Sequence, residues 1–582
     1  MKNYKKVYAA FILAGGLILH GCNGIFDDLA INPNQPSMGA YFTSPSAVND
    51  AVMTMYGYMS TQRCLGASGS KTTIIRSDEA SSNSDYGKPG MFGADLNASY
   101  YTIEQPYTLM YTTASQASYI IETAPSVDFS GNEEMRNAYM GEAYFWRAFA
   151  HYYLLINFRN ISPIRQMPRN GDDYVRPLEK PAAVWDFIQE DLAHAKELLP
   201  VKGYWDSKNA GRVTKASAAA LLGKAYLYRS GIEQYYGEDK TTFYSEAAKE
   251  FGDVIDGKYG TYDLTKNYAD NFDVAHENND ESILEFQFLG DVDNAGFNPG
   301  LATSGLAFDS RGLMLPGAGV GYEGVVHNWL YNAFVNSVDK DGYTDIRMFS
   351  TMIFNDLDAS IHLRNDAGGN PVRLEGPGGY KWEELYPAKN GKEGFATVSN
   401  PLAHSFKAGI RKGIDCSMPT QTEADGTPKL VGVGAGVKEY VYNQPRAHGV
   451  NWRYIRYADV LMMYAESVVS GGTPASNMTP LQAVNKVRGR ANMSELPSVT
   501  MADIQNERIL EFALEGHRFY DLLRWGKLAS RFTELQESDP NFKKFISADD
   551  FKGFVTNKHE WLPIPINEVN SNPYITENNP GY

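Results

Sequence analysis

The chain has 582 residues and 43% hydrophobic content, which is enough for a large globular core. Its formal net charge of −16 excludes nucleic acid as a partner, because binding to phosphates needs a basic surface. Only three cysteines are present, so the sequence predicts no disulfide framework and no zinc site.

The N-terminus has the pattern of an export signal. Three lysines precede an apolar run at residues 7–19, which is too short to span a bilayer but typical of a signal peptide. The next residues read HGC and end at Cys22, an arrangement similar to a bacterial lipobox despite His20. We therefore expect removal of residues 1–21, acylation of Cys22, and a change in net charge from −16 to −19, since three lysines and no acids are lost. A plain secretory signal is the alternative.

The N-terminal third of the mature chain is expected to be mainly helical. Residues 22–43 are polar and rich in Pro and Asn, which is typical of a tether. Apolar spacing predicts a helix at residues 48–59, with Ser44 and Ser46 available as caps. A loop is predicted at residues 66–97, and further helices at residues 104–122 and 133–157.

Small and large residues then alternate as in tetratricopeptide helix pairs. The pattern begins with Leu222, Gly223 and Tyr226 and continues with Ala247 and Phe251. This spacing fits two nested antiparallel helices with a long loop between them. We place that loop at residues 231–242. Similar helical segments are predicted at residues 185–199, 454–467 and 480–490.

Residues 503–527 are the most heavily patterned helical stretch. Apolar residues recur at steps of three and four, which predicts a helix with a wide buried face, and Gly516 marks a kink or a break between two helices. Charged residues three positions apart are expected to form a salt-bridge ladder: Arg508 with Glu511, Glu515 with Arg518, and Asp521 with Arg524.

Glu511 and Glu515 also invite comparison with the acid pair of a glycosidase. The neighbouring arginines argue against this interpretation, because they lower carboxylate pKa values, whereas a general acid needs a raised pKa. We therefore interpret the pair as structural. No Walker loop, HExxH, GxSxG or zinc-ligand spacing is found, and the sequence predicts no enzyme, no cofactor and no metal site.

Residues 261–450 differ from the helical parts because they are rich in Gly, Asn, Asp and Pro. Short strands are predicted at residues 283–288 and 439–442. Long loops in a helical scaffold are usually functional, so we expect ligand binding here. Cys64 and Cys416 are interpreted as structural, with a disulfide between them left open, and the C-terminal residues 531–582 are expected to fold back onto the helices.

Several segments together resemble the SusD/RagB family of outer-membrane nutrient-binding lipoproteins of Bacteroidetes. Besides the lipobox at Cys22, the resemblance is carried in chain order by GEAYFWRAFAHYYLLINF (141–158), VTKASAAALLGKAYLYRSG (213–231), NNDESILEFQF (278–288), WRYIRYADVLMMYAES (452–467), ERILEFALEGHRFYDLLRWG (507–526), LPIP (562–565) and the terminal NNPGY. One departure is Asn578, where the family usually has glutamine.

The resemblance implies a mainly α fold, with a single SusD-like domain over residues 44–582. Tetratricopeptide helix pairs are expected at residues 44–260 and 451–530, with the loop-rich insertion between them. It implies a surface lipoprotein of the outer membrane that binds a glycan and passes it to a SusC-like TonB-dependent transporter. Uptake of peptides, as in RagB-like members, is the alternative, and a glycoside hydrolase is a more distant one.

A glycan site needs exposed aromatic planes flanked by polar groups, so aromatic residues in loops are the candidates. The predicted ligand-binding residues are Asn83, Asp85, Tyr86, Phe92, Tyr322, Trp329, Tyr380 and Trp382. Loop packing or a contact with the transporter is the alternative role for each. Four other tryptophans are assigned to the fold: Trp146, Trp185, Trp525 and Trp561.

Overall fold

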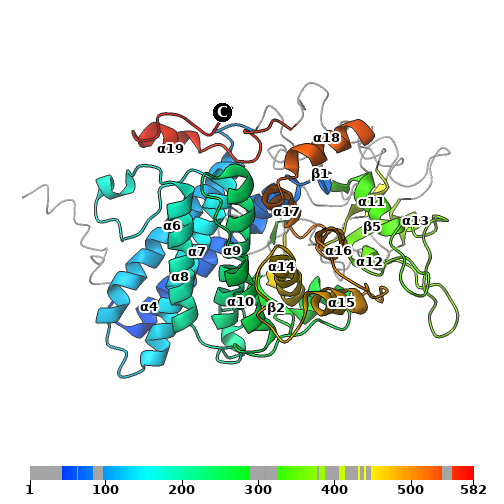
Figure 1. Ribbon diagram of the computed structural model, residues 1–582, viewed down its shortest axis with the longest axis horizontal. Helices are drawn as coiled ribbons and strands as arrows, with labels where there is room; N and C mark the ends of the chain where they lie inside the picture. The colour runs from blue at the N-terminus through cyan, green and yellow to red at the C-terminus, as the bar shows by residue number, and fades with distance from the viewer. Residues whose placement is uncertain are drawn as a thin grey trace, which may run out of the picture.

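A helical half and a half built around a small sheet make up the molecule, and helices α16 and α17 lie between them (Figure 1). This computed structural model describes residues 42–61, 63–82, 96–288, 308–309, 324–376, 379, 381–386, 406–412, 430–432, 438–440, 447–539 and 554–582. Within these ranges, no helix combines the length and apolar character needed to cross a lipid bilayer.

The helical half is an array in which each helix packs against the next one along the chain. Its members are α4 (Pro45–Ser60), α6 (Tyr101–Thr123), α7 (Glu133–Phe158), α8 (Pro181–Leu198), α9 (Lys215–Tyr236), α10 (Tyr244–Ile255), α14 (Tyr457–Val469) and α15 (Pro480–Arg490). Ser44 caps α4 by accepting a hydrogen bond from the backbone N–H of Ala47 at 3.3 Å. The predicted mainly α fold and its helix pairs are confirmed.

The α9–α10 pair shows why the small and large positions matter. A Cβ added at Gly223 in α9 would lie 2.8 Å from the Phe251 ring of α10, so only glycine allows the two helices to approach this closely. The connection between the helices is shorter than predicted, because α9 continues to Tyr236. Its last residues pack against the segment around Gly526.

Strands are short and form one sheet and three two-stranded ribbons. The sheet has the order β1-β4-β6-β5, and the ribbons pair β10 with β2, β3 with β9, and β7 with β8. The strand bounds are β1 (Ala80–Ser82), β2 (Ser282–Phe286), β3 (Phe308–Asp309), β4 (Gly324–Val326), β5 (Met352–Phe354), β6 (Ala408–Ile410), β7 (Leu430–Gly432), β8 (Lys438–Tyr440), β9 (Ala447–His448) and β10 (Trp452–Arg456). The strands predicted at residues 283–288 and 439–442 correspond to β2 and β8.

Short helices surround the sheet and the junction. They are α5 (Ser70–Ile74), α11 (Asn328–Val335), α12 (Met348–Thr351), α13 (Trp382–Leu385), α16 (Met501–Glu511), α17 (Arg518–Arg524), α18 (Leu528–Ser538) and α19 (Ile566–Ser571). The prediction of a loop throughout residues 66–97 was wrong, because a π-helical turn at Leu65–Gly69, α5 and β1 occupy its first part. This segment packs against α6 and α17, so tertiary contacts order it.

The predicted break at Gly516 is confirmed. Helix α16 ends at Glu511 and α17 begins at Arg518, and between them Leu514 and Gly516 have φ values of 61° and 84°. Both residues have a left-handed backbone conformation, which reverses the direction of the chain. The stretch 503–527 therefore folds as two helices.

The predicted salt-bridge ladder was mostly wrong, because long-range partners replace the local ones. Only the Asp521–Arg524 pair forms, at 2.9 Å. Arg508 instead binds Asp521 at 2.8 Å and Asp459 of α14 at 2.8 Å. The turn at Gly516 separates Glu515 from Arg518, whereas Arg508 and Glu511 share α16 and bind partners on other elements, with Glu511 paired to Arg347, Arg456 and Arg490.

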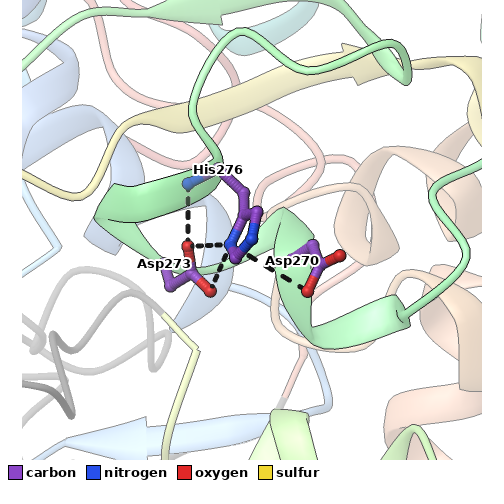
Figure 2. Close-up of side chains that lie close together, drawn as sticks. All are labelled: Asp270, Asp273 and His276. Carbon is purple, nitrogen blue, oxygen red and sulfur yellow. Dashed lines mark hydrogen bonds and ion pairs between the residues drawn. The ribbon is translucent and has the colours of Figure 1, made fainter.

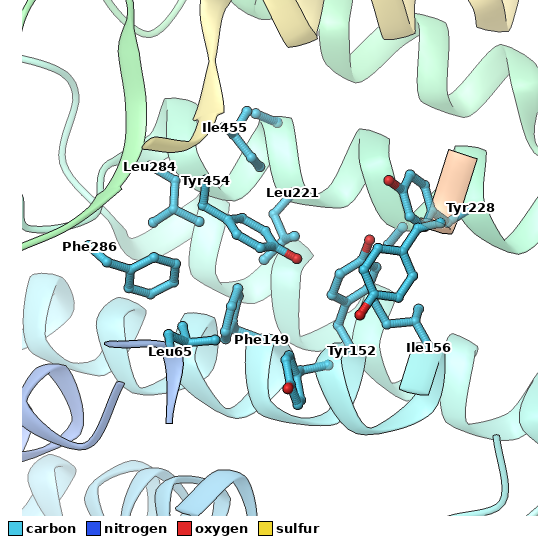
Figure 3. Close-up of a cluster of buried hydrophobic side chains, with 14 of the residues drawn as sticks. Leu65, Phe149, Tyr152, Ile156, Leu221, Tyr228, Leu284, Phe286, Tyr454 and Ile455 are labelled. Atoms are coloured by element: carbon cyan, nitrogen blue, oxygen red, sulfur yellow. The ribbon is translucent and has the colours of Figure 1, made fainter. Parts of the chain in front are cut away.

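The β2–β10 ribbon lies on α7 and α9 and closes an aromatic core (Figure 3). Phe149, Phe286 and Tyr454 contact one another with ring centroids 5.3–5.7 Å apart in edge-to-face geometry. The four tryptophans assigned to the fold are all buried, as predicted: Trp146, Trp185, Trp525 and Trp561.

The C-terminal segment folds back onto the helical half, as predicted. Asn579 donates to the carbonyls of Phe158 and Leu562 at 2.7 Å each, and the N–H of Leu562 bonds to the carbonyl of Asn157 at 2.7 Å. Cys64 is a buried free thiol, whereas Cys416 lies outside the described residues.

Candidate functional site

Strands β1 and β4 are neighbours in the sheet, although more than 200 residues separate them in the sequence. They pair antiparallel, with Ala80 opposite Val326 and Ser82 opposite Gly324. Asp78 and Glu79 precede β1, and His327 and α11 follow β4, so these residues meet at the same end of the sheet, where the N–H of His327 bonds to the carbonyl of Glu79 at 2.9 Å.

Six of the eight predicted contacts lie outside the described residues, and so does the acylation site Cys22. The six are Asn83, Asp85, Tyr86, Phe92, Tyr322 and Tyr380. Their individual roles stay predictions.

Trp329 is in the first turn of α11, which follows β4, and its side chain is partly buried. Its indole N–H donates to the backbone carbonyl of Asp78. The guanidinium of Arg531 lies 4.2 Å from the ring centroid, and that of Arg518 lies 5.5 Å from it. Trp329 is therefore an aromatic plane flanked by two cationic hydrogen-bond donors.

The carboxylate of Asp78 holds these two arginines in place. It accepts from Arg518 at 2.9 and 3.1 Å and from Arg531 at 2.7 Å. Burial by itself would raise the pKa of Asp78, but the two guanidinium groups outweigh that effect and lower the pKa below its usual value. Asp78 thus remains ionised and fixes the orientation of both donors beside Trp329.

The neighbouring Glu79 differs from Asp78 in its protonation state. Burial, together with the charge of Asp78, raises the pKa of Glu79 to about 8, so this carboxyl is protonated at neutral pH. It accepts a hydrogen bond from the backbone N–H of Leu514 at 3.1 Å and so connects β1 to the turn between α16 and α17.

Ser81 and His327 form a close pair that resembles part of a nucleophile site. The Nε2 atom of His327 lies 2.5 Å from the Ser81 hydroxyl, and its Nδ1 atom lies 2.7 Å from the backbone carbonyl of Asp78. Both residues are only 2% exposed, and burial lowers the pKa of His327. Because a substrate has no access and a carbonyl replaces the orienting carboxylate, the pair serves as a structural link between β1 and β4.

Trp382 lies in the first turn of α13 and is only 5% exposed. Its ring centroid is 4.5 Å from that of Tyr386. The predicted role of Trp382 as a ligand contact therefore has no support from the described geometry, which places its ring in the interior.

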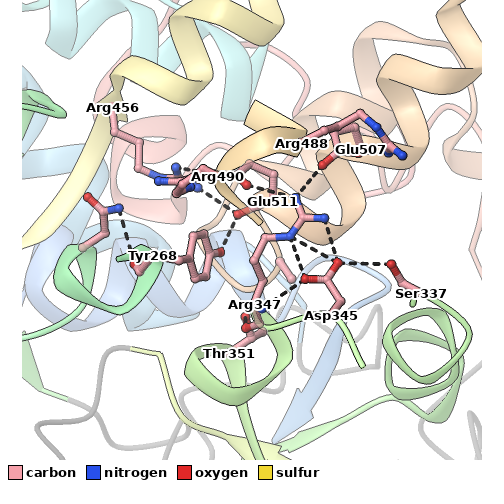
Figure 4. Close-up of polar contacts among 12 residues, drawn as sticks. Tyr268, Ser337, Asp345, Arg347, Thr351, Arg456, Arg488, Arg490, Glu507 and Glu511 are labelled. Carbon is pink, nitrogen blue, oxygen red and sulfur yellow. Dashed lines mark hydrogen bonds and ion pairs between the residues drawn. The ribbon is translucent and has the colours of Figure 1, made fainter. Parts of the chain in front are cut away.

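Glu511 belongs to a buried ion network and has no features of a general acid (Figure 4). It accepts from Arg456 at 2.7 Å, from Arg347 at 3.0 Å, and from Arg490. Burial by itself would raise its pKa, but the three arginines lower the pKa of Glu511 to about 2. This carboxylate is always ionised near neutral pH, which agrees with the structural role expected from the sequence.

Asp270, Asp273 and His276 form the one group of potential metal ligands found among the described residues (Figure 2). The Nδ1 atom of His276 lies 2.8 and 2.9 Å from the Asp273 carboxylate oxygens, and these contacts raise the pKa of His276. The guanidinium group of Arg453 donates a hydrogen bond to the backbone carbonyl of His276 at 2.8 Å. The raised pKa of His276 favours its cationic form, and this form and the nearby guanidinium both disfavour a metal cation, so we assign Asp273 to capping of the short helix Val274–His276.

Sequence reasoning selected Trp329 as a candidate but gave no ligand-binding role to Asp78, Arg518 and Arg531, which the structure places beside it. Arg518 and Asp78 are 440 positions apart, and no spacing rule connects residues at such a distance. Arg518 was expected to pair with Glu515 within a helix, and the reversal at Gly516 is what turns it toward Asp78.

Two family profiles match the chain. One is described as "SusD family" and covers residues 425–582. The other is described as "Starch-binding associating with outer membrane" and covers residues 31–227. Together they account for more than half of the sequence and include both ends of the helical array.

Individual relatives agree with this result. A SusD-like protein of Bacteroides ovatus is 25% identical over 533 residues, which cover 90% of this chain and 83% of the relative. A SusD superfamily structure from Bacteroides vulgatus aligns with a TM-score of 0.67 at 22% identity, over 93% of this chain and all of that structure. A laminarin-binding SusD-like protein aligns with a TM-score of 0.62 at 22% identity, over 93% of this chain and 100% of the other.

Proposed function

The chain belongs to the SusD/RagB family, and from this premise we propose that it captures an oligo- or polysaccharide at the cell surface and delivers it to a SusC-like TonB-dependent transporter. Members of this family are binding proteins, and the proposal assigns no chemistry to the chain. The laminarin-binding relative supports a carbohydrate ligand.

The surroundings of Trp329 are the observation that best supports this proposal. A sugar ring has an apolar face of CH groups and a rim of hydroxyls, so it pairs with an aromatic plane bordered by hydrogen-bond donors. Trp329 supplies a partly exposed ring, and the guanidinium of Arg531, whose side chain is 16% exposed, lies over that ring at 4.2 Å from its centroid. A sugar would contact the rest of the ring and accept hydrogen bonds from Arg531. Strand β4, which leads into α11 and Trp329, pairs with β1, which follows Asp78 in the chain, so the sheet holds Asp78 beside Trp329.

Acylation of Cys22 would keep the receptor at the outer membrane beside its transporter. A tethered receptor works at a high effective concentration of its partner, so modest affinity for each sugar unit is sufficient for uptake. Replacement of Cys22 by serine should release the protein from membranes without changing its affinity for a glycan. Metabolic labelling with palmitate and fractionation of cells measure the two effects.

Affinity gels containing laminarin or starch test the binding function, with full-length protein in detergent. We expect the wild type to be retarded by at least one polysaccharide and Trp329→Ala to lose most of that retardation. Trp329→Phe keeps a ring and should retain binding in part. Tyr574→Ala, which removes an exposed aromatic ring from the C-terminal segment, is the matched control. Equal retardation of Trp329→Ala and wild type would contradict this site, and a co-purified peptide would favour RagB-like uptake.

A further inference from the structure

A cavity of about 670 Å³ opens among the helices, away from the sheet that carries Trp329. Its lining residues come from the C-terminal part of α9, the start of α10, the ends of α14 and α17, and the first turns of α16. Its volume is within the range of small-molecule sites. Its lining includes neither Trp329 and its neighbouring residues, which form the sheet-side site, nor Glu511 and its three arginines.

The floor of this cavity is polar, and its charges are balanced. Glu466 of α14 forms an ion pair with Arg524 of α17, and the indole N–H of Trp525 donates to the same carboxylate at 2.9 Å. All three side chains are buried. Because the carboxylate and the guanidinium neutralise each other, the floor offers a rigid surface without net charge.

The walls combine aromatic rings with hydroxyl and amide groups. Tyr235 is 52% exposed, and its ring lies over Gly526, where an added Cβ would be 2.5 Å from the ring. Thr242 and Ser470 also line the cavity, and neither they nor Tyr235 form a side-chain hydrogen bond within the described part of the chain. Three hydroxyls are thus available beside an exposed aromatic face.

Lys527 adds a positive charge at the rim. Its ammonium group donates to the side-chain carbonyl of Gln505 at 2.7 Å, and no ion pair joins it to a carboxylate among the described residues. With Glu466 and Arg524 paired, Lys527 leaves the lining with one net positive charge, in a protein whose formal net charge is −16. An anionic group on a ligand is therefore favoured here over bulk solution.

We propose that this cavity is a second carbohydrate site, selective for a saccharide unit that carries an acidic group. The sugar ring stacks on Tyr235, its hydroxyls bond to the hydroxyl and amide groups of the walls, and its carboxylate faces Lys527. This inference deepens the proposed function by adding a ligand class and a second position on the helical side. It depends on residues other than Trp329, so the two sites can be tested separately.

Isothermal titration calorimetry on the full-length protein in detergent tests the site, with trigalacturonate as the acidic probe and maltotriose as the neutral one. We expect Tyr235→Ala to weaken trigalacturonate binding about 5–10-fold, since it removes the stacking surface. Lys527→Gln should weaken it about 3–5-fold at low salt, with little effect on maltotriose. Tyr574→Ala and Lys266→Gln replace exposed residues of the same types elsewhere and should bind like the wild type.

Two results would overturn the second site. One is the absence of heat with trigalacturonate at millimolar concentration. The other is binding that Trp329→Ala abolishes while Tyr235→Ala and Lys527→Gln leave it unchanged, which would place the acidic sugar at the sheet and leave the proposed function intact. Equal retardation of Trp329→Ala and wild type in gels, together with Lys527-dependent trigalacturonate binding, would instead refute the site at Trp329 alone. The melting temperatures of Tyr235→Ala and Lys527→Gln should match that of the wild type, because both substituted side chains are exposed.

Discussion

Replacing Glu511 with glutamine tests how the buried ion network stabilises the junction between the two halves. The Glu511 side chain is fully buried and accepts from Arg456 at 2.7 Å and from Arg347 at 3.0 Å. Glutamine keeps the shape but removes the negative charge, and its amide group places further donors against guanidinium groups that have only donors. The variant therefore leaves three buried guanidinium groups with one carboxylate fewer to balance their charge.

Two independent arguments give a similar magnitude. Breaking a buried ion pair by removing one partner costs about 3–5 kcal/mol. The fall in the pKa of Glu511 from 4.5 to about 2 corresponds by linkage to roughly 3 kcal/mol. We expect Glu511→Gln to lower the free energy of unfolding at pH 7 by about 3–5 kcal/mol.

Urea unfolding followed by circular dichroism measures this loss as a lower midpoint at unchanged slope. Glu495→Gln, an exposed substitution in the loop before α16, is the matched control and should stay within about 0.5 kcal/mol of wild type. The folded pKa of Glu511 is below the unfolded one, so its contribution is complete above pH 4.5 and disappears as the pH falls toward 2. The difference between variant and wild type should therefore be constant from pH 6 to 8 and shrink in acid.

A Glu511→Gln protein that unfolds within about 1 kcal/mol of wild type at pH 7 would refute this reasoning. Such a result would mean that the remaining carboxylates around Arg456 compensate fully. A difference that does not change between pH 6 and pH 3 would refute the electrostatic origin of the effect.

Three further substitutions probe other features. The pKa of Glu79 is about 8 in the folded protein, above its unfolded value, so the free energy of unfolding falls as the pH rises from 4.5 to 8. In urea unfolding, Glu79→Gln should therefore have the same free energy of unfolding as the wild type at pH 5 and exceed it by about 2–4 kcal/mol at pH 9. Gly223→Ala places a methyl group 2.8 Å from the ring of Phe251 and should cost about 1–3 kcal/mol of stability in thermal unfolding. Gly489→Ala, with open space around its Cβ, is the control and should be neutral or slightly stabilising. Equal melting temperatures for the two variants would contradict the close approach of α9 and α10. Asn579→Ala leaves the buried carbonyl of Leu562 without its donor and removes one of the two donors to the carbonyl of Phe158, so it should cost about 1–3 kcal/mol. Faster proteolysis of the C-terminal segment is a second measurement, and unchanged protection would contradict the role of Asn579 in attaching that segment.

Local patterns in the sequence were sufficient for the helices. The helix predicted at residues 133–157 corresponds to α7 (Glu133–Phe158), since apolar spacing over seven turns leaves little ambiguity. The break at Gly516 was also predictable, because glycine in a helical pattern marks a left-handed position or a kink. In both cases the decisive interactions lie within a few residues of one another.

The site required information that local patterns do not contain. Arg518 looked like a partner of Glu515 one turn away, but the chain reverses between them and Arg518 binds Asp78. Trp382 looked like an exposed ring in a Gly-rich loop, and a single turn of helix buries it against Tyr386. A side chain's exposure depends on what packs over it, and composition does not specify that partner.

The sequence by itself determined the family, the helical array, the attachment of the C-terminal segment and Trp329 as an aromatic candidate, because each depends on periodicity or on a contiguous motif. Only the tertiary structure decided which charges face one another: Asp78 with Arg518 and Arg531, and Glu511 with its three arginines. The physical reason is that a buried charge is stable only with a compensating partner, and the chain can supply that partner from any element that the fold brings within about 3 Å.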